Sequence, residues 1–142
     1  MPSRPAGRFP SLHVPFNELL GLRVEHREKG RCLVTVAKRP DLTNSWSVMH
    51  GGVVMTMLDV ALAVAAHSHV EDTEGLITVN LSVSFLSAGT GGLVAEGRLI
   101  RGGKSLVFCE GEVRGEDGEV VAKGVGTYKV RRRKEPVEPR AG

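Results

Sequence analysis

The sequence NSWSVMHGGVVMTMLDVALAVAAH, residues 44–67, decides the fold of this chain. Two glycines, Gly51 and Gly52, are followed by an almost unbroken apolar run that no proline interrupts. This pattern predicts a helix from about Gly51 to about His67. Because the helix is apolar on nearly every side, other elements must wrap around it.

A membrane span is the alternative interpretation of this run, and two features argue against it. The run 51–66 is shorter than the ~20 residues that cross a bilayer. Asp59 lies near its centre, where hydrocarbon would strongly disfavour a carboxylate. We therefore expect a buried core helix and no membrane partner.

Strand-like segments lie on both sides of the predicted helix. Before it, a short helix at 15–20 precedes two strands, 22–28 and 31–37, joined at Lys29-Gly30. After it we expect strands at 76–86, 93–101, 104–114 and 119–130, with turns at Gly102-Gly103 and Asp117-Gly118. In the strand at 76–86, apolar and polar residues alternate. We therefore expect one apolar face, formed by Val79, Leu81, Val83 and Phe85, and one polar face, formed by Thr78, Asn80, Ser82 and Ser84.

These elements predict an α+β fold in which one long central helix is wrapped by a curved antiparallel sheet of five to six strands. We expect three segments along the chain: a flexible N-terminal segment over residues 1–11, one domain over 12–130, and a basic flexible tail over 131–142.

Composition fits a single folded domain with no nucleic-acid partner. The chain has 142 residues, of which 41% are hydrophobic and 25% charged. Its net charge of +3 comes from four basic residues at 131–134, because subtracting those 4 charges leaves −1. Aromatic residues are only 4%, and no basic stripe follows an element, unlike a nucleic-acid-binding surface.

The two cysteines, Cys32 and Cys109, lie in strand-like runs without metal-ligand neighbours at short spacing. Buried free thiols in a reducing compartment are the simplest interpretation. Residues 1–10 hold no apolar signal-peptide core, so we expect a cytoplasmic protein. His67 and His69 end the helix without a third ligand nearby, and we expect no metal site.

Asp59 is the strongest candidate for chemistry. No Lys or Arg lies on its helix, and burying an unpaired carboxylate costs several kcal/mol. Such acids concentrate at active sites, where they act as general bases or nucleophiles. The structural alternative is an aspartate paired with a hydroxyl or a backbone group of another strand.

Gly51 and Gly52 open the predicted helix. The first turn of a helix offers unpaired N–H groups and partial positive charge, and glycine lets a ligand approach closely. Together they could form an oxyanion hole. The alternative is that the two glycines only end the loop before the helix and bind nothing.

The spacing within the helix predicts a two-chain site. Gly51 and Asp59 are eight residues apart, which is ~12 Å along a helix axis. One reacting carbon cannot meet both residues of the same chain, since the attacking group must come within ~3–3.5 Å. Two antiparallel copies related by a two-fold axis could bring Gly51 of one to Asp59 of the other.

The order of Asn44, His50-Gly51-Gly52 and Asp59 resembles the hotdog-fold acyl-CoA thioesterases, over about residues 12–130. It looks most like the phenylacetate-degradation (PaaI-like) type, and is similar to the 4-hydroxybenzoyl-CoA thioesterases and to a human thioesterase-superfamily member. The resemblance implies a hydrolase that cleaves acyl-CoA thioesters to free acid and coenzyme A.

It also implies roles for single residues. Asp59 would be the nucleophile or the general base, and the Gly51 N–H of the other subunit the oxyanion donor. Asn44 would lie near the attacking group or a bound water, and His50 near the thioester sulfur and carbonyl. Thr78 would help to place water from across the interface.

Four further residues are expected to bind substrate: Gly52, Trp46, Gly103 and Lys104. Trp46 could line the pocket mouth or pack the loop, and Gly103 and Lys104 could meet coenzyme A phosphates or form a plain turn. The basic tail could assist them or be solvated. The resemblance implies no cofactor beyond the coenzyme A of the substrate, and a required homodimer joined edge to edge, which in this family often pairs further into a dimer of dimers.

Two other hotdog functions are less consistent with the sequence. Hydratases and dehydratases of this fold typically carry a Pro-Gly before the helix, which is absent here. Non-catalytic acyl-CoA-binding members usually lack the helix acid. The chain also departs from the thioesterase pattern at Ser47, where glycine is common, and at Ala88, where proline often ends the strand.

Overall fold

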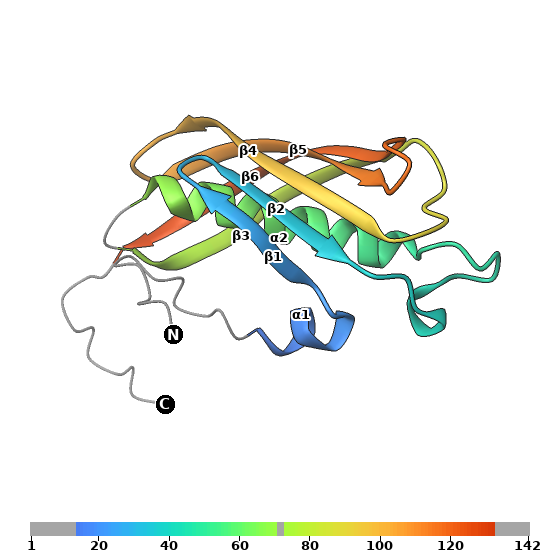
Figure 1. Cartoon of the computed structure of the whole chain (residues 1–142). Coiled ribbons are helices and arrows are strands. Elements are labelled where there is room, and N and C mark those ends of the chain that lie inside the picture. The colour runs from blue at the N-terminus through green and yellow to red at the C-terminus, as the bar shows by residue number, and fades with distance from the viewer. Residues whose placement is uncertain (1–13, 71–72, 133–142) are drawn as a thin grey trace.

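The computed structural model describes residues 14–70 and 73–132. Within these residues, six strands form one antiparallel sheet that curls around a single long helix, α2 (Figure 1). The strand order is β1-β2-β4-β5-β6-β3. The predicted architecture, an antiparallel sheet wrapping one helix, is confirmed.

The elements lie close to the predicted ranges. In chain order they are α1 (Pro15–Leu20), β1 (Arg23–Glu28), β2 (Arg31–Val36), the 3₁₀ helix η1 (Pro40–Leu42), α2 (Gly51–His69), β3 (Thr73–Phe85), β4 (Leu93–Gly102), β5 (Leu106–Gly115) and β6 (Val120–Arg132). β6 runs two residues into the segment predicted as tail, pairing Arg131 with Gly75 and Arg132 with Thr73. The rest of that tail and the predicted N-terminal segment lie outside the described residues.

Helix α2 is the centre of the hydrophobic core. Its 19 residues make it longer than predicted, and by length and composition it could cross a membrane. The length argument against a span was therefore wrong, but the expected burial of the helix in the core is observed. Met57, Leu58, Ala61 and Leu62 are completely buried, as expected of a core helix inside a curved sheet.

A row of glycines lets α2 lie close to the sheet. Gly97, Gly111 and Gly124 are direct neighbours on β4, β5 and β6. A Cβ atom on Gly97 would overlap the carbonyl oxygen of Ala61, and one on Gly124 would lie 2.7 Å from Cδ2 of Leu58. Side chains at these positions would push the helix away from the strands.

Strand β3 does not keep the simple alternation predicted for it. Thr78 pairs with Tyr128 and Asn80 with Thr127, so Val79 is an extra residue, a β-bulge. Beyond the bulge, Leu81 pairs with Gly126, so Thr78 and Leu81 share the face of the buried Tyr128. The prediction that Thr78 lies on the face opposite Leu81 was wrong.

Candidate active site

Asp59 lies half-buried on α2, within reach of hydroxyls from two strands. The Thr78 hydroxyl of β3 donates to Oδ1 of Asp59 at 3.1 Å, with Oδ2 at 3.4 Å. The Tyr128 hydroxyl of β6 donates to Oδ1 at 2.8 Å. Hydroxyls rather than cations are thus the partners of this carboxylate in the described part of the chain.

The surroundings of Asp59 match the structural alternative that the sequence left open. We favoured a buried acid without a partner, whereas the structure shows a half-buried acid with two hydroxyl donors from other strands. These contacts explain how an apolar helix tolerates the charge. They converge on Oδ1 and leave Oδ2 with one long hydrogen bond, so Oδ2 retains capacity to accept a proton.

Tyr128 is the site residue that sequence reasoning missed. Its side chain is completely buried, and burial, together with the negative charge of Asp59, raises the pKa of its hydroxyl. Tyr128 therefore keeps its proton and donates a hydrogen bond to Asp59. The available signal was weak: a buried tyrosine needs a hydrogen-bond partner, but sequence does not reveal which one.

The start of α2 contains one open backbone donor. His50 is the N-cap, and its Nδ1 accepts from the Gly52 N–H at 2.7 Å. A neutral His50 consequently carries its proton on Nε2. The Gly51 N–H has no acceptor among the described residues. The expectation that both glycines offer free N–H groups was wrong for Gly52.

Asn44 organises the loop that precedes α2. Its Oδ1 accepts from the N–H groups of Trp46 at 2.9 Å and Val48 at 3.4 Å. Ser47 has a φ of 60° and is the only non-glycine residue with positive φ in the described ranges. This explains why glycine suits that position.

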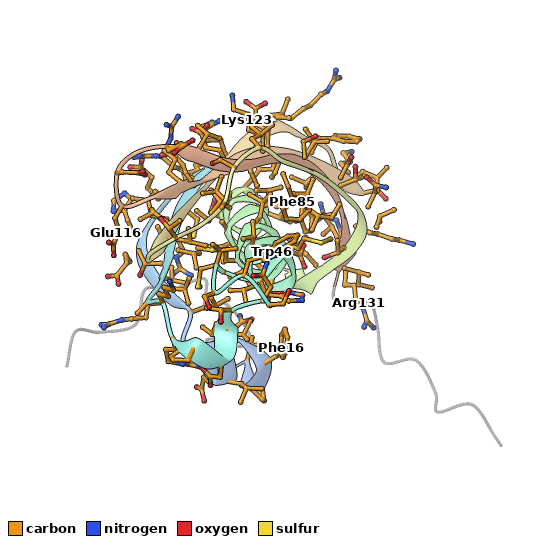
Figure 2. The ribbon with its side chains drawn as sticks, turned by 90° about the vertical axis from the view of Figure 1, so that its right-hand side faces the viewer. Phe16, Trp46, Phe85, Glu116, Lys123 and Arg131 are labelled. Carbon is orange, nitrogen blue, oxygen red and sulfur yellow. The ribbon has the colours of Figure 1, made fainter. Side chains whose placement is uncertain are left out.

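Large apolar side chains are exposed around this end of α2. Trp46 at the loop tip is 83% exposed, so it does not pack the loop as one alternative proposed. Phe85, at the end of β3, is 52% exposed and lies against Gly51, where an added Cβ would be 3.3 Å from Cε1 of the ring. Figure 2 views the molecule from this side, with Trp46 and Phe85 labelled.

Gly103 and Lys104 lie at the other end of α2. They form the β4–β5 turn and line a cleft of about 470 Å³ with His69, Val70, Gly102 and Arg132. Arg132 donates to the Lys104 carbonyl oxygen at 3.0 Å. Lys104 and Arg132 give the cleft two positive charges. The cleft lies far from Asp59, because His69 in its lining is ten residues further along the helix, which is ~15 Å along the axis.

The predicted site residues therefore occupy three places in one chain. Asp59 and Thr78 are in contact. Asn44, Trp46, His50, Gly51 and Gly52 cluster around the start of the helix, and Gly103 and Lys104 lie beyond its end. The described residues contain no group of three His, Cys, Asp or Glu side chains that could hold a metal ion.

This architecture, one long core helix wrapped by an antiparallel six-stranded sheet, is that of a hotdog-fold protein. Comparison with known proteins gives the family. Residues 47–122 match the Thioesterase superfamily. The chain belongs to this superfamily of thioester-cleaving enzymes.

Relatives with described activities cover most of the chain. YigI of Salmonella typhimurium, a medium/long-chain acyl-CoA thioesterase, is 30% identical over 134 residues, which span 83% of this chain and 86% of YigI. YigI of Escherichia coli is 28% identical over the same shares.

Solved structures show the same fold. A thioesterase family protein from Silicibacter pomeroyi superposes with a TM-score of 0.81 at 25% identity, covering 84% of this chain and 91% of that one. The PaaI protein of the phenylacetic acid degradation operon of E. coli has a TM-score of 0.77 at 21% identity, covering 83% and 85%.

Proposed function

We propose that this protein hydrolyses acyl-CoA thioesters, with Asp59 as the reacting acid. The observation that carries the proposal is the carboxylate of Asp59, which two hydroxyls hold through Oδ1 while Oδ2 stays available. The acyl-CoA thioesterase activity of the YigI relatives supports the substrate class.

Two routes of hydrolysis fit this carboxylate. As a general base, Asp59 takes a proton from water, whose oxygen attacks the thioester carbon. As a nucleophile, it attacks directly and forms an anhydride that water then cleaves. In both routes the carbonyl oxygen becomes negative, the carbon–sulfur bond breaks, and coenzyme A leaves as a thiol after protonation.

The oxyanion donor in this proposal is Gly51 of a second subunit. Within one helix Gly51 and Asp59 are ~12 Å apart along the axis, so they cannot act on the same carbon. Phe85, which lies against Gly51, and Trp46 in the loop before α2 are both exposed, which suits a surface that a second copy covers. The protein is then a homodimer with two shared sites, and pairs of dimers could form tetramers.

Turnover of an acyl-CoA panel tests the activity. A thiol-detecting dye would follow release of coenzyme A from short, medium, long and aryl substrates. The protein's own thiols should add little background, because burial raises the pKa of Cys32 and Cys109 to about 12. We expect Asp59→Asn to lower kcat by about 10²–10⁴-fold. No release by the wild type, with coenzyme A esters still bound, would instead indicate a non-catalytic binding protein.

The Gly51 donor can be removed with one substitution. Proline is favoured at the first helical position and lacks an N–H, and His50, with ψ of 138°, has the extended backbone that precedes proline. Gly51→Pro should lower kcat by about 10²–10³-fold. Gly51→Ala is the matched control, since it adds the same Cβ and keeps the N–H. Equal kcat values in both variants would refute the donor role.

Subunit complementation tests the shared site. Co-expressed Asp59→Asn and Gly51→Pro chains form mixed dimers in which one of two sites has both an intact Gly51 and an intact Asp59. With random pairing, about a quarter of the wild-type sites return, whereas each variant alone stays inactive. If co-expression restores no activity, both residues act within one chain or do not act together.

The cleft at the other end of α2 is proposed to hold the phosphates of coenzyme A. Lys104 and Arg132 supply its positive charge, and cationic side chains bind phosphate oxygens. Lys104→Ala should raise KM for acyl-CoA but not for the N-acetylcysteamine thioester of the same acyl group, which lacks phosphates. An equal rise in KM for both substrates would argue against this site.

A further inference from the structure

Tyr128 is buried directly beside the acid that the proposed function uses. It lies on β6 opposite Thr78 of β3, and none of its side chain is exposed. Its hydroxyl lies 2.8 Å from Oδ1 of Asp59 and 3.3 Å from the Asp59 carbonyl oxygen. A single buried hydroxyl thus reaches both the side chain and the backbone of the same residue.

The sheet leaves room for this contact at Gly126. A Cβ atom at Gly126 would lie 2.8 Å from Cε2 and 2.9 Å from the hydroxyl oxygen of Tyr128. Any larger residue would displace the Tyr128 ring from its place under the helix. The ring therefore lies along its own strand toward Asp59, rather than only filling the core.

Substrate cannot be the partner of this hydroxyl, because Tyr128 has no exposed surface in the chain. Its hydrogen bond goes to the oxygen that Thr78 also contacts most closely. Two donors on Oδ1 fix the rotation of the carboxyl group. Oδ2 has only one long contact. It is then the oxygen that accepts a proton from water or attacks the thioester carbon.

We propose that Tyr128 is a positioning residue that holds the Asp59 carboxylate through Oδ1 and leaves Oδ2 as the reacting oxygen. The inference rests on the proposed function. Tyr128 holds the carboxylate without touching the substrate.

Tyr128→Phe removes only the hydroxyl and keeps the buried ring. Hydrogen bonds to charged groups contribute about 1.5–3 kcal/mol, so we expect kcat to fall by about 10-fold to 150-fold while KM changes little. The acidic limb of the kcat/KM profile should move to higher pH, because the ionised carboxylate loses a donor. A purely structural role would lower stability without moving that limb.

The control is Thr127→Val, which removes a hydroxyl from the neighbouring position of β6 on the other face of the sheet. It should keep the wild-type kcat and pH profile. Wild-type kcat and an unmoved acidic limb in Tyr128→Phe, in protein that remains folded by circular dichroism, would overturn the positioning role.

A second measurement separates this inference from the proposed function. Carbon-13 NMR follows the Asp59 carboxyl carbon through a pH titration and needs no turnover. In Tyr128→Phe its midpoint should move to higher pH, and an unchanged midpoint would overturn the inference. If the wild type cleaved no thioester of the panel, the proposed function would fail, while the titration would still decide whether Tyr128 holds the carboxylate.

Discussion

Thr78 and Asp59 are joined by a hydrogen bond, Oγ1 to Oδ1 at 3.1 Å, that exists because β3 contains one extra residue. Without the bulge at Val79, a strand with Leu81, Val83 and Phe85 facing the helix would turn Thr78 away from it. A local irregularity of the backbone thus supplies the second hydroxyl of the candidate site.

The Thr78 hydroxyl should contribute to turnover. Thr78→Val keeps the branched shape but removes the donor, and we expect kcat to fall by about tenfold. Thr78→Ser keeps the donor and should retain most of the activity. Steady-state kinetics on the best acyl-CoA substrate measure both variants. Equal losses in the two would show that side-chain shape, not the hydroxyl, is what matters.

The close approach of α2 to the sheet makes Gly97 intolerant of any side chain. A Cβ there would overlap the Ala61 carbonyl oxygen, which is backbone and cannot rotate away. Gly97→Ala should therefore cost about 3 kcal/mol or more of unfolding free energy, measured by urea denaturation. Gly91→Ala is the control, because its Cβ would meet only the movable end of Glu116 at 3.2 Å. A Gly97→Ala protein as stable as Gly91→Ala would mean that the helix can move away from the sheet.

The fold was predictable because its signals are local. The apolar run after Gly52 predicted a wrapped helix, and the Gly102-Gly103 and Asp117-Gly118 pairs predicted the turns that order β4, β5 and β6. The face of Thr78 was not predictable, because residue type alone does not show where a strand gains an extra residue.

The site itself was only partly predictable. Asp59 stood out because a carboxylate is unusual in an apolar helix, and His50-Gly51-Gly52 marked the start of that helix. Tyr128 gave no such signal, since an inward-facing tyrosine in a strand looks like ordinary core until the fold places it against Asp59. That pairing is set by the register of β6, which is a tertiary property.

Replacing Ser47 by glycine should stabilise the fold, because the backbone conformation at this position favours glycine. Its φ of 60° is strained for a residue with a Cβ, so Ser47→Gly should stabilise the fold by about 0.5–1 kcal/mol. Ser45→Gly is the control, since Ser45 has no positive φ and glycine there should be neutral or slightly destabilising. Thermal denaturation at one protein concentration compares the variants. If Ser47→Gly melts below the wild type, the Ser47 side chain contributes more than the strain costs.

The charge cluster around Glu96 predicts a pH-dependent part of the stability. Burial raises the pKa of the Glu96 carboxyl, but hydrogen bonds from Arg31 and Arg98 outweigh it, so the pKa is lowered from 4.5. An acid with a lowered pKa in the folded state stabilises the fold above its unfolded pKa of about 4.3. That contribution is lost as pH falls through the lower folded value.

Replacing Glu96 should therefore matter at neutral pH and cease to matter in acid. We expect Glu96→Gln to lower the unfolding free energy by about 1 kcal/mol at pH 7, since its side chain is 22% exposed and solvent screens part of the attraction. The difference from wild type should shrink below pH ~4.3. Urea denaturation at a fixed protein concentration from pH 7 to pH 3 measures it. Glu28→Gln is the matched control, because Glu28 meets the same Arg31 at 3.4 Å but is 53% exposed. A Glu96→Gln difference that stays constant across this range would locate the effect in packing rather than in charge.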